Sequence, residues 1–416
     1  MSTVFDPESC RRQFPALQRQ LDGSPVVYFD GPAGSQVPAS VIDAVSAYLG
    51  KTNANHGGNF LTSVESDAIL AEAHRAGADF VGSADPALVA FGANMTTLTF
   101  ALSRALAATW QAGDEVLVTR SAHDANFTPW VRAAADAGAL VKYVDIVPGD
   151  GTLDLEDLAA KLSGRTRLVA LACASNFSGT IHPVEKITAL AHEAGAQVFL
   201  DAVHYAPHAP LAVEQWDCDF LVCSAYKFFG PHVGLLWGKR RWMEELPAYK
   251  VRPAGDSSPD RWMTGTQNHE GIAGTLAAID YLAGLSCPGQ QPADRRAALL
   301  ESWKLVAEYE RDLLGSLLDG LAGVAGLKVW GITDPSRMQE RVPTVSFTIE
   351  GCPSAEIDRH LASRGIFAWN GNFYAQPLSE ALGLEPDGAV RVGLLHYNTA
   401  AEVDRLIKAL QEFVQG

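Results

Sequence analysis

The fold is decided by residues 197–227, which read QVFLDAVHYAPHAPLAVEQWDCDFLVCSAYK. Two apolar runs in this stretch, 197–200 and 220–223, have the length and the β-branched and aromatic content of buried strands. Asp201 directly follows the first run, and Ser224 and Lys227 follow the second. In open α/β sheets, ligands bind beyond the carboxyl ends of the strands. The stretch therefore predicts an α/β fold and says where its functional site lies.

Similar patterns continue on both sides of this stretch. Further candidate strands are 87–91, 115–119, 141–144, 168–173 and 233–237, with helical patterns between most of them, for example 97–109 and 184–194. Strands that alternate with helices are typical of a mostly parallel sheet covered on both faces. We predict one large domain, residues 26–285, built on a mostly parallel seven-stranded sheet.

A turn-rich break at 286–292 precedes a different pattern. A long helical segment, 293–321, is followed by strands near 328–330, 344–349 and 389–394 and by a closing helix at 400–414. This pattern predicts a smaller α+β C-terminal domain. We assign residues 286–416 to it, together with residues 1–25, which we expect to pack against it.

Composition limits the possible partners. The formal net charge is −16, and no concentrated basic patch interrupts the acidic chain, so nucleic acid and anionic membranes are not expected partners. Residues 1–8 lack the features of a secretory signal, and no uninterrupted apolar run reaches ~18 residues. The six cysteines form no CxxC pair, so we expect no metal site and no disulfide framework. Together these features predict a cytoplasmic protein.

Two earlier strand ends carry polar residues suited to a phosphorylated ligand. Ala93 and Asn94 open a predicted helix, where main-chain N–H groups and the helix dipole bind phosphate well. By itself this is equally an ordinary glycine turn with Asn94 as helix N-cap. Asn176, in the segment 172–180, is either a hydrogen-bond partner for a ring hydroxyl or a turn residue.

Asp201 and Lys227 complete the pattern. A desolvated lysine amine forms a Schiff base with an aldehyde, and an aspartate beside a pyridine nitrogen keeps it protonated, so that the ring accepts electrons. Alone, Asp201 is a cap and Lys227 a surface lysine beyond a strand. In this order along the chain, and all after strands, the residues predict pyridoxal 5′-phosphate (PLP) bound to Lys227.

The sequence resembles the class V aminotransferase group of fold-type I PLP enzymes, and within it the cysteine desulfurase and selenocysteine lyase branch. Residues 28–36, with Ala33, resemble the substrate-side turn of that family, and residues 53–57, with Asn55, resemble its next motif. The resemblance implies the fold-type I architecture, a homodimer and an amino-acid substrate whose carboxylate is bound by Arg391. A surface ion pair is the alternative for Arg391.

Further roles follow from the same resemblance. It implies that His123 stacks on the pyridine ring, with a simple loop histidine as the alternative. It places His204 where the desulfurases have a glutamine that touches the phenolic oxygen. The phosphate-binding residues that it implies, the last of them reaching the other subunit's cofactor, are Ala93, Asn94, Ser224 and Thr266.

The sequence departs from the desulfurases in the segment 365–378. Tyr374 falls where that branch has its cysteine nucleophile, and Trp369 falls where it has a second arginine. Cys352 is too far upstream to replace the cysteine. Tyr374 is a candidate proton donor, and the alternative is that Tyr374, Trp369 and Phe373 only line the pocket. We therefore expect no sulfur relay through a cysteine.

The sequence leaves the reaction open. Our first hypothesis is a lyase-type reaction at Cβ of an α-amino acid, by β-elimination or β-decarboxylation. Decarboxylative or aldol/Mannich-type carbon–carbon bond formation comes second. Transamination, epimerisation and cysteine desulfuration or selenocysteine lysis follow. A non-catalytic scaffold is the alternative of a different class, and the presence of Lys227 with Asp201 argues against it.

Overall fold

The computed structural model describes residues 5–415 of the chain. Residues 1–4 and residue 416, which we assigned to the small domain, lie outside the described part. The same is true of the first half of the segment 1–8, in which we saw no secretory signal.

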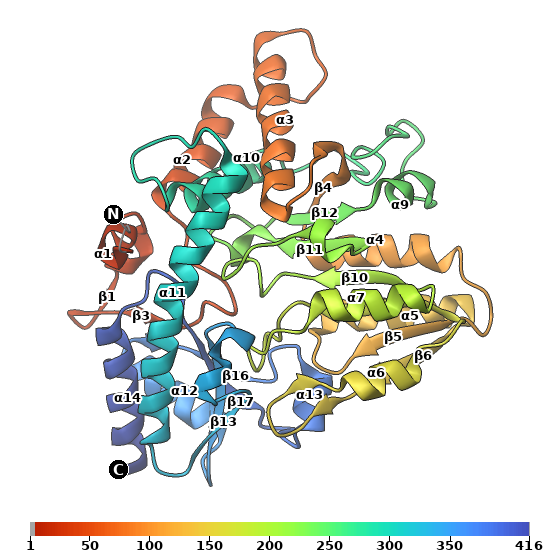
Figure 1. Cartoon of the computed structure of the whole chain (residues 1–416). Coiled ribbons are helices and arrows are strands. Elements are labelled where there is room, and N and C mark those ends of the chain that lie inside the picture. Colours follow the sequence, from red (N-terminus) through yellow and green to blue (C-terminus); the bar gives the residue numbers. More distant parts are fainter. Residues whose placement is uncertain (1–4, 416) are drawn as a thin grey trace.

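A seven-stranded sheet forms the centre of the larger part of the molecule (Figure 1). Each of its strands overlaps a predicted one, which confirms that part of the expectation. In spatial order the strands are β4 (Val89–Gly92), β12 (Gly234–Gly238), β11 (Phe220–Ser224), β10 (Gln197–Asp201), β9 (Thr166–Ala172), β5 (Glu115–Thr119) and β6 (Leu140–Val144).

The sheet is mostly parallel, with β12 running antiparallel to both of its neighbours. The connection from Ser224 to Gly234 explains this, because it is too short for the crossover that a parallel pair needs. Instead it forms a short 3₁₀ turn, η5 (Ala225–Lys227), before the chain returns. Lys227 therefore lies at the edge where β10 and β11 end.

Both faces of the sheet are buried, and the side chains alternate between them. Phe199 and Phe220 pack on one face against α4 (Met95–Ala107) and α5 (Thr128–Ala137), and Trp130 of α5 meets Phe199 edge to face at 4.7 Å. Val198 and Leu221 pack on the other face in a core shared with α3 (Leu61–Val81), α7 (Val184–Glu193) and α10 (His269–Gly284). This burial explains why the strands have almost uniformly apolar sequences.

A smaller antiparallel sheet follows, in the order β13 (Leu327–Trp330), β14 (Thr344–Ile349), β17 (Ala389–Gly393) and β16 (Trp369–Gly371). It lies below the large sheet in Figure 1, beside α12 (Ser354–Ser363) and α14 (Ala400–Gln415). We did not predict β16, which has only three residues and includes a glycine. Its pairing of Trp369 with Arg391 brings two predicted site residues onto adjacent strands.

The long helix α11 (Arg295–Ala322) joins the two cores. Leu299 and Trp303 pack in a core of the large sheet, whereas Leu314, Leu317 and Leu321 pack against the small sheet. Near the N-terminus, Phe14 contacts Phe229 and Tyr281 as well as Tyr397. The segment before residue 26 therefore contacts both parts of the molecule, and the exact division into two domains stays a prediction.

The remaining elements connect these layers. No helix in the described range 5–415 combines the length and the apolar character needed to cross a membrane. The other helices and strands are α1 (Pro7–Arg11), η1 (Pro15–Gln18), β1 (Gln20–Leu21), β2 (Ser24–Pro25), β3 (Val27–Tyr28), α2 (Ala39–Ala47), η2 (Tyr48–Thr52), η3 (Pro86–Leu88), η4 (Asp124–Asn126), β7 (Ile146–Val147), β8 (Thr152–Leu153), α6 (Leu155–Lys161), α8 (Val213–Trp216), α9 (Arg240–Glu245), η6 (Pro335–Glu340), β15 (Ile366–Phe367) and α13 (Gln376–Ala381).

Candidate functional site

A cavity of about 710 Å³ lies between the carboxyl edge of the large sheet and the small sheet. It is lined by residues from both parts of the chain, including Pro32, the start of α4 and the segment 369–374. Seven residues that the sequence singled out lie together in its wall, although they are far apart along the chain: Ala33, His123, Asn176, Lys227, Trp369, Tyr374 and Arg391.

Lys227 reaches this cavity from η5. Its Nζ donates a hydrogen bond to the main-chain carbonyl of Pro32 and lies 5.1 Å from the centre of the Tyr226 ring. Burial, assisted by the positive charge of Arg391, lowers the pKa of Lys227 to about 7. A substantial fraction of the amine is therefore neutral near pH 7, which is the form that attacks a carbonyl carbon.

Two buried carboxyl groups act on Lys227. Asp201, at the end of β10, is 5% exposed, and its Oδ1 accepts a hydrogen bond from the N–H of Val203 at 2.9 Å. Asp30 has a buried Oδ1 without a hydrogen-bond partner among the described residues. Burial raises the pKa of each carboxyl to about 6, and Lys227 acts in the opposite direction on both. Either carboxylate can thus stabilise positive charge placed in the cavity.

The start of α4 lies beside the end of β11. Asn94 caps the helix, and its Oδ1 accepts from the N–H of Thr97 at 2.8 Å. The Oγ of Ser224 accepts from the N–H of Met95 at 3.2 Å. A Cβ on Gly234 would lie only 2.4 Å from the carbonyl carbon of Asn94, so the close approach of β12 to this turn requires glycine. The first turn of α4 is thereby held beside the end of β11. Thr96 of this turn lines the cavity, and Ala93 and Asn94 just before it are exposed.

His123 forms one wall of the cavity. Its Nδ1 accepts a hydrogen bond from the N–H of Ala125 at 3.0 Å. Burial, together with the charges of Lys227 and Arg391, lowers the pKa of His123 to about 4. The imidazole is therefore neutral at pH 7 with its proton on Nε2, and it offers a flat, uncharged face.

Arg391, on β17, enters the cavity from the small sheet. Its Nη1 donates to the carbonyl of Asn176 at 2.8 Å, and its guanidinium lies 4.1 Å from the centre of the Phe373 ring. Burial lowers the pKa of Arg391 to about 9, so the side chain stays cationic at pH 7. One recorded side-chain hydrogen bond leaves donors for a carboxylate, which a guanidinium binds in bidentate fashion.

The two aromatic residues of the segment 369–374 are largely open to solvent. Tyr374 is 72% exposed and Trp369 is 53% exposed. The Tyr374 ring stacks on His123 with ring centres 5.5 Å apart, and its carbonyl accepts from the N–H of Asp124 at 2.7 Å. Phe373 and Tyr374 both have left-handed backbone conformations, with φ of 56° and 58°. This strained turn directs the Tyr374 ring onto His123.

Seven predicted site residues do not line this cavity in the single chain. Four of them, described above at the strand ends, are Ala93, Asn94, Asp201 and Ser224, and the other three are Asn55, His204 and Thr266. Thr266 lines a different cavity of about 570 Å³, next to His56, and Asn55 is exposed on the same segment as His56. His204 is buried, and its Nε2 contacts the Oγ1 of Thr344 at 2.9 Å. His204 therefore faces the small sheet.

Sequence reasoning did not single out Asp30, Thr96 or Phe100. Thr96 and Phe100 lie in the first turns of α4 and line the cavity. Thr96 and Phe100 are four residues apart and therefore share one face of α4, so either residue would have pointed to the other, although their spacing from Asn94 gave no signal. Asp30 comes two residues after the buried strand β3, and Asp201 is the last residue of β10, so a search for acidic residues at strand ends would have found Asp30 too.

No cysteine lines the cavity. All six cysteines belong to the described part of the chain. Cys10, Cys173, Cys218 and Cys223 are buried, whereas Cys287 and Cys352 are partly exposed elsewhere on the molecule. Cys352 forms an isolated β-bridge with Ile349 just before α12.

Known proteins resemble this chain along almost its whole length. The profile described as "Aminotransferase class-V" matches residues 27–406. The chain belongs to the class V aminotransferase family. This is a PLP-dependent enzyme family, and the fold described above is the fold-type I architecture.

Individual relatives match along their whole length. The chain is 33% identical to the aminotransferase-like protein FGM3 of Gibberella zeae, over 99% of both chains. It is 30% identical to a probable cysteine desulfurase of Synechocystis, over 97% of this chain and 95% of the relative. The crystal structure of the Escherichia coli cysteine desulfurase CsdA superposes with a TM-score of 0.84 at 26% identity, over 99% of both chains.

The residues of this member of the class V family fit PLP. Lys227 supplies a desolvated amine, and a buried carboxyl group acts on it from Asp201. The Oδ1 of Asn176 is buried without a hydrogen-bond partner, as expected of a group that awaits a polar ligand atom. The main-chain N–H groups at the start of α4 offer a phosphate site.

Proposed function

We propose that this chain binds PLP on Lys227 and catalyses a lyase-type reaction at Cβ of an α-amino acid. The observation that carries the proposal is the lowered pKa of Lys227, about 7, in a cavity that also holds Arg391. One group is suited to carbonyl chemistry and the other to binding a carboxylate. Family membership supports the cofactor.

Each residue has a task in this proposal. PLP supplies, when bound, an electron sink for the carbanion formed at the substrate Cα. Asp201 would hold the pyridine nitrogen protonated, and the neutral face of His123 would cover the ring. Lys227, once its amine is free, would take the proton from Cα. Arg391 would bind the substrate carboxylate and so orient the bond that breaks.

The charges of the cavity favour β-elimination over β-decarboxylation. In one chain, the basic residues of the lining are Lys227 and Arg391, since His123 is neutral. Once Lys227 holds the cofactor, Arg391 is the one cationic side chain left in the lining, and it can pair with one substrate carboxylate. A substrate with a second carboxylate at Cβ would place it among aromatic and amide side chains without a counter-charge.

The alternative favoured by the relatives' names is cysteine desulfuration. That reaction, as the sequence comparison above implies, needs a cysteine nucleophile near the substrate sulfur. Tyr374 occupies the place expected for it, and the cavity wall contains no cysteine. These observations support the proposal that the chain lacks the desulfurase nucleophile.

We also propose that the enzyme is a homodimer. Asn55 and Thr266 lie away from the cavity of their own chain, and Thr266 borders a second cavity that includes Asp67 of α3. A partner related by a two-fold axis would bring such residues to the other subunit's cofactor.

The cofactor is tested by absorbance. Purified protein incubated with PLP and desalted should show a visible absorption band, which Lys227→Ala should abolish while the protein stays folded by circular dichroism. A protein that never takes up PLP would contradict the proposal.

The reaction is tested with L-cysteine and a panel of other α-amino acids. β-Elimination from L-cysteine releases sulfide, ammonia and pyruvate, whereas desulfuration yields alanine. We expect a keto acid with one equivalent of ammonia from at least one amino acid. Robust conversion of L-cysteine to alanine, with a thiol reductant present, would instead establish the desulfurase alternative.

A further inference from the structure

The loop that carries Asn176 is held at three successive carbonyls by side chains of the small sheet and of the segment just before β14. The carbonyl of Asn176 accepts from Arg391 Nη1 at 2.8 Å, that of Phe177 accepts from Ser346 Oγ at 2.6 Å, and that of Ser178 accepts from Arg341 Nη2 at 3.1 Å. The loop, residues 175–180, follows β9 of the large sheet in sequence. Its polar contacts nevertheless bind it to the small sheet.

Arg341 is an unusual member of this group. Its side chain is buried, with 5% of the residue exposed, and its three acceptors are all main-chain carbonyls, of Ile332, Ser178 and Thr344. Burial is the sole cause that lowers the pKa of Arg341, to about 10, and no neighbouring carboxylate offsets it. A buried cation without a counter-ion costs free energy, so ion pairing does not explain its position.

Main-chain hydrogen bonds and close packing also hold this loop against the segment 340–344. The N–H of Val342 donates to the carbonyl of Gly179, and the N–H of Ile181 donates to the carbonyl of Glu340, both at 2.8 Å. Gly179 has φ of +76°, and a Cβ there would lie 2.6 Å from the carbonyl oxygen of Thr344. The loop and the segment 340–344 therefore fit against each other as closely as glycine allows.

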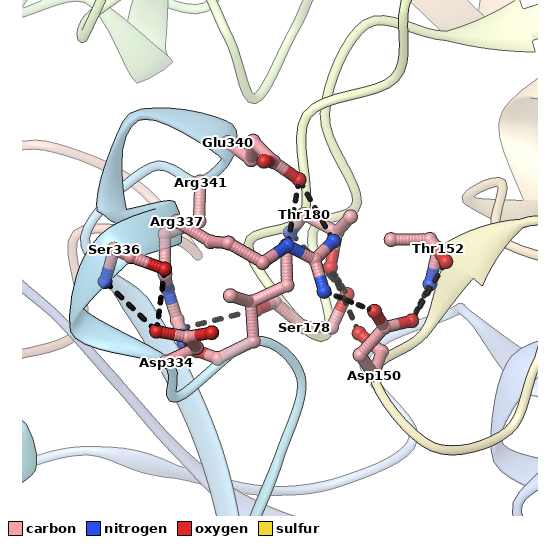
Figure 2. Close-up of polar contacts among 10 residues, drawn as sticks. Asp150, Thr152, Ser178, Thr180, Asp334, Ser336, Arg337, Glu340 and Arg341 are labelled. Atoms are coloured by element: carbon pink, nitrogen blue, oxygen red, sulfur yellow. Dashed lines mark hydrogen bonds and ion pairs between the residues drawn. The ribbon is translucent and has the colours of Figure 1, made fainter.

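A second arginine nearby provides a natural comparison. Arg337 lies between Asp150 and Glu340 (Figure 2), and its Nη1 and Nη2 meet their carboxylates at 2.6 and 2.7 Å. Its side chain is 33% exposed and makes no recorded contact with the loop carbonyls. Arg337, within η6, thus forms a surface ion-pair network, whereas Arg341, directly after η6, reaches the loop itself.

The position of the loop determines two groups in the cavity. Asn176 Nδ2 donates to the carbonyl of Phe373 at 2.9 Å, and the Asn176 carbonyl accepts from Arg391. Ser178, bound by Arg341, lies two residues beyond Asn176. A displacement of Ser178 therefore moves the acceptor that orients the Arg391 guanidinium.

We propose that Arg341 is a positioning residue: it fixes the 175–180 loop on the small sheet and so sets the direction in which Asn176 and Arg391 present their polar atoms to the substrate. The inference rests on the proposed function, because it takes Arg391 as the carboxylate-binding group. It assigns Arg341 a role in substrate affinity without contact with substrate or cofactor.

The test compares Arg341→Met with Arg337→Met, both in the full-length protein loaded with PLP. L-Alanine serves as the probe, and its dissociation constant is read from the change in visible absorption. We expect Arg341→Met to bind PLP yet weaken L-alanine binding about tenfold or more, since small displacements of orienting groups have large effects. Arg341→Lys should recover part of the loss, and Arg337→Met should stay within about twofold of the parent.

A second measurement, made on the protein without cofactor, accompanies the L-alanine binding assay. In the apoprotein, amide hydrogen exchange of residues 175–181 should be faster in Arg341→Met than in Arg337→Met. The Gly179 amide donates to the carbonyl of Ser175 within the loop, and the Ile181 amide donates to the carbonyl of Glu340 in the adjoining segment, so both bonds depend on how the loop is held. If Arg341→Met fails to fold, Ser346→Ala, which removes the donor to Phe177, should give both effects in weaker form.

The two proposals fail in different ways. A parent protein that takes up no PLP would defeat the proposed function. A folded, PLP-loaded Arg341→Met with parental L-alanine affinity and parental exchange at 175–181 would overturn the role of Arg341. So would a loss of PLP binding in Arg341→Met with unchanged exchange, since the residue would then act through the cofactor site instead.

Discussion

At the scale of single residues, the amine of Lys227 makes a prediction about pH. Its pKa is lowered to about 7 by burial and by Arg391, against the opposing effects of Asp201 and Asp30. Attack on an aldehyde requires the neutral amine, and the neutral fraction grows as pH rises through the pKa. The rate at which PLP restores visible absorption to the apoprotein should therefore rise about tenfold per pH unit below pH ~6 and level off above pH ~8.

Arg391→Met provides the control for this profile. Arg391 lowers the pKa of Lys227, so its removal should move the profile to higher pH. Rates in the parent protein that keep rising beyond pH ~9, as for a solvated lysine, would contradict the desolvated amine.

Tyr374 makes a second prediction at this scale. Its ring stacks on His123, its side chain makes no recorded hydrogen bond, and the residue is largely exposed. We expect the ring rather than the hydroxyl to matter: Tyr374→Phe should keep kcat within about threefold, whereas Tyr374→Ala should lose much of it. A fall in kcat of about a hundredfold in Tyr374→Phe, the size typical of a lost proton donor, would assign the hydroxyl a catalytic role.

At the scale of elements, the close approach of β12 to α4 is decisive. A Cβ at Gly234 would collide with the main chain of Asn94 and push the first turn of α4 away from Ser224. Gly234→Ala should lower stability by about 1–3 kcal/mol and weaken PLP binding, because the phosphate site is displaced. Thermal unfolding and PLP titration measure the two effects.

Gly315, within α11, gives the matched control. Nothing lies within 4 Å of a Cβ added there. Gly315→Ala should leave PLP affinity unchanged and stabilise the protein by about 0.5–1 kcal/mol, as expected for a partly exposed position inside a helix with room for the methyl group. Equal PLP affinity in both variants would show that the start of α4 does not hold the phosphate.

At the scale of the whole molecule, large apolar side chains are exposed along a continuous part of the chain, on α2, η2 and the start of α3. They are Ile42, Leu49, Phe60, Leu61 and Val64, and Leu61 is 72% exposed. Exposed apolar side chains of this kind are typical of a protein interface, which supports the proposed homodimer. We expect the protein to elute with twice the mass of its chain in light-scattering chromatography, and Leu61→Asp with Val64→Asp to yield monomers with weakened PLP binding.

Leu140→Asp, at the edge strand β6, is the control for the dimer. Leu140 is 53% exposed, comparable to Val64, but lies on a different element. This variant should stay dimeric. A parent protein that elutes as a monomer at micromolar concentration would contradict the homodimer and leave Thr266 and Asn55 without a role at the cofactor.

The sequence by itself determined the seven strands, their mostly parallel orientation and the polar residues at their ends. Buried strands have uniformly apolar sequences, and the carboxyl ends of parallel strands lie at the same edge of the sheet. It found Asp201 and Lys227 for this reason. Only the tertiary structure decided what surrounds them. The burial that lowers the pKa of Lys227 and the pairing of Trp369 with Arg391 arise from contacts between distant segments. Arg341 is another residue whose role the sequence did not predict. No feature of the residues around it indicates that its guanidinium will be buried and will bind the carbonyl of Ser178.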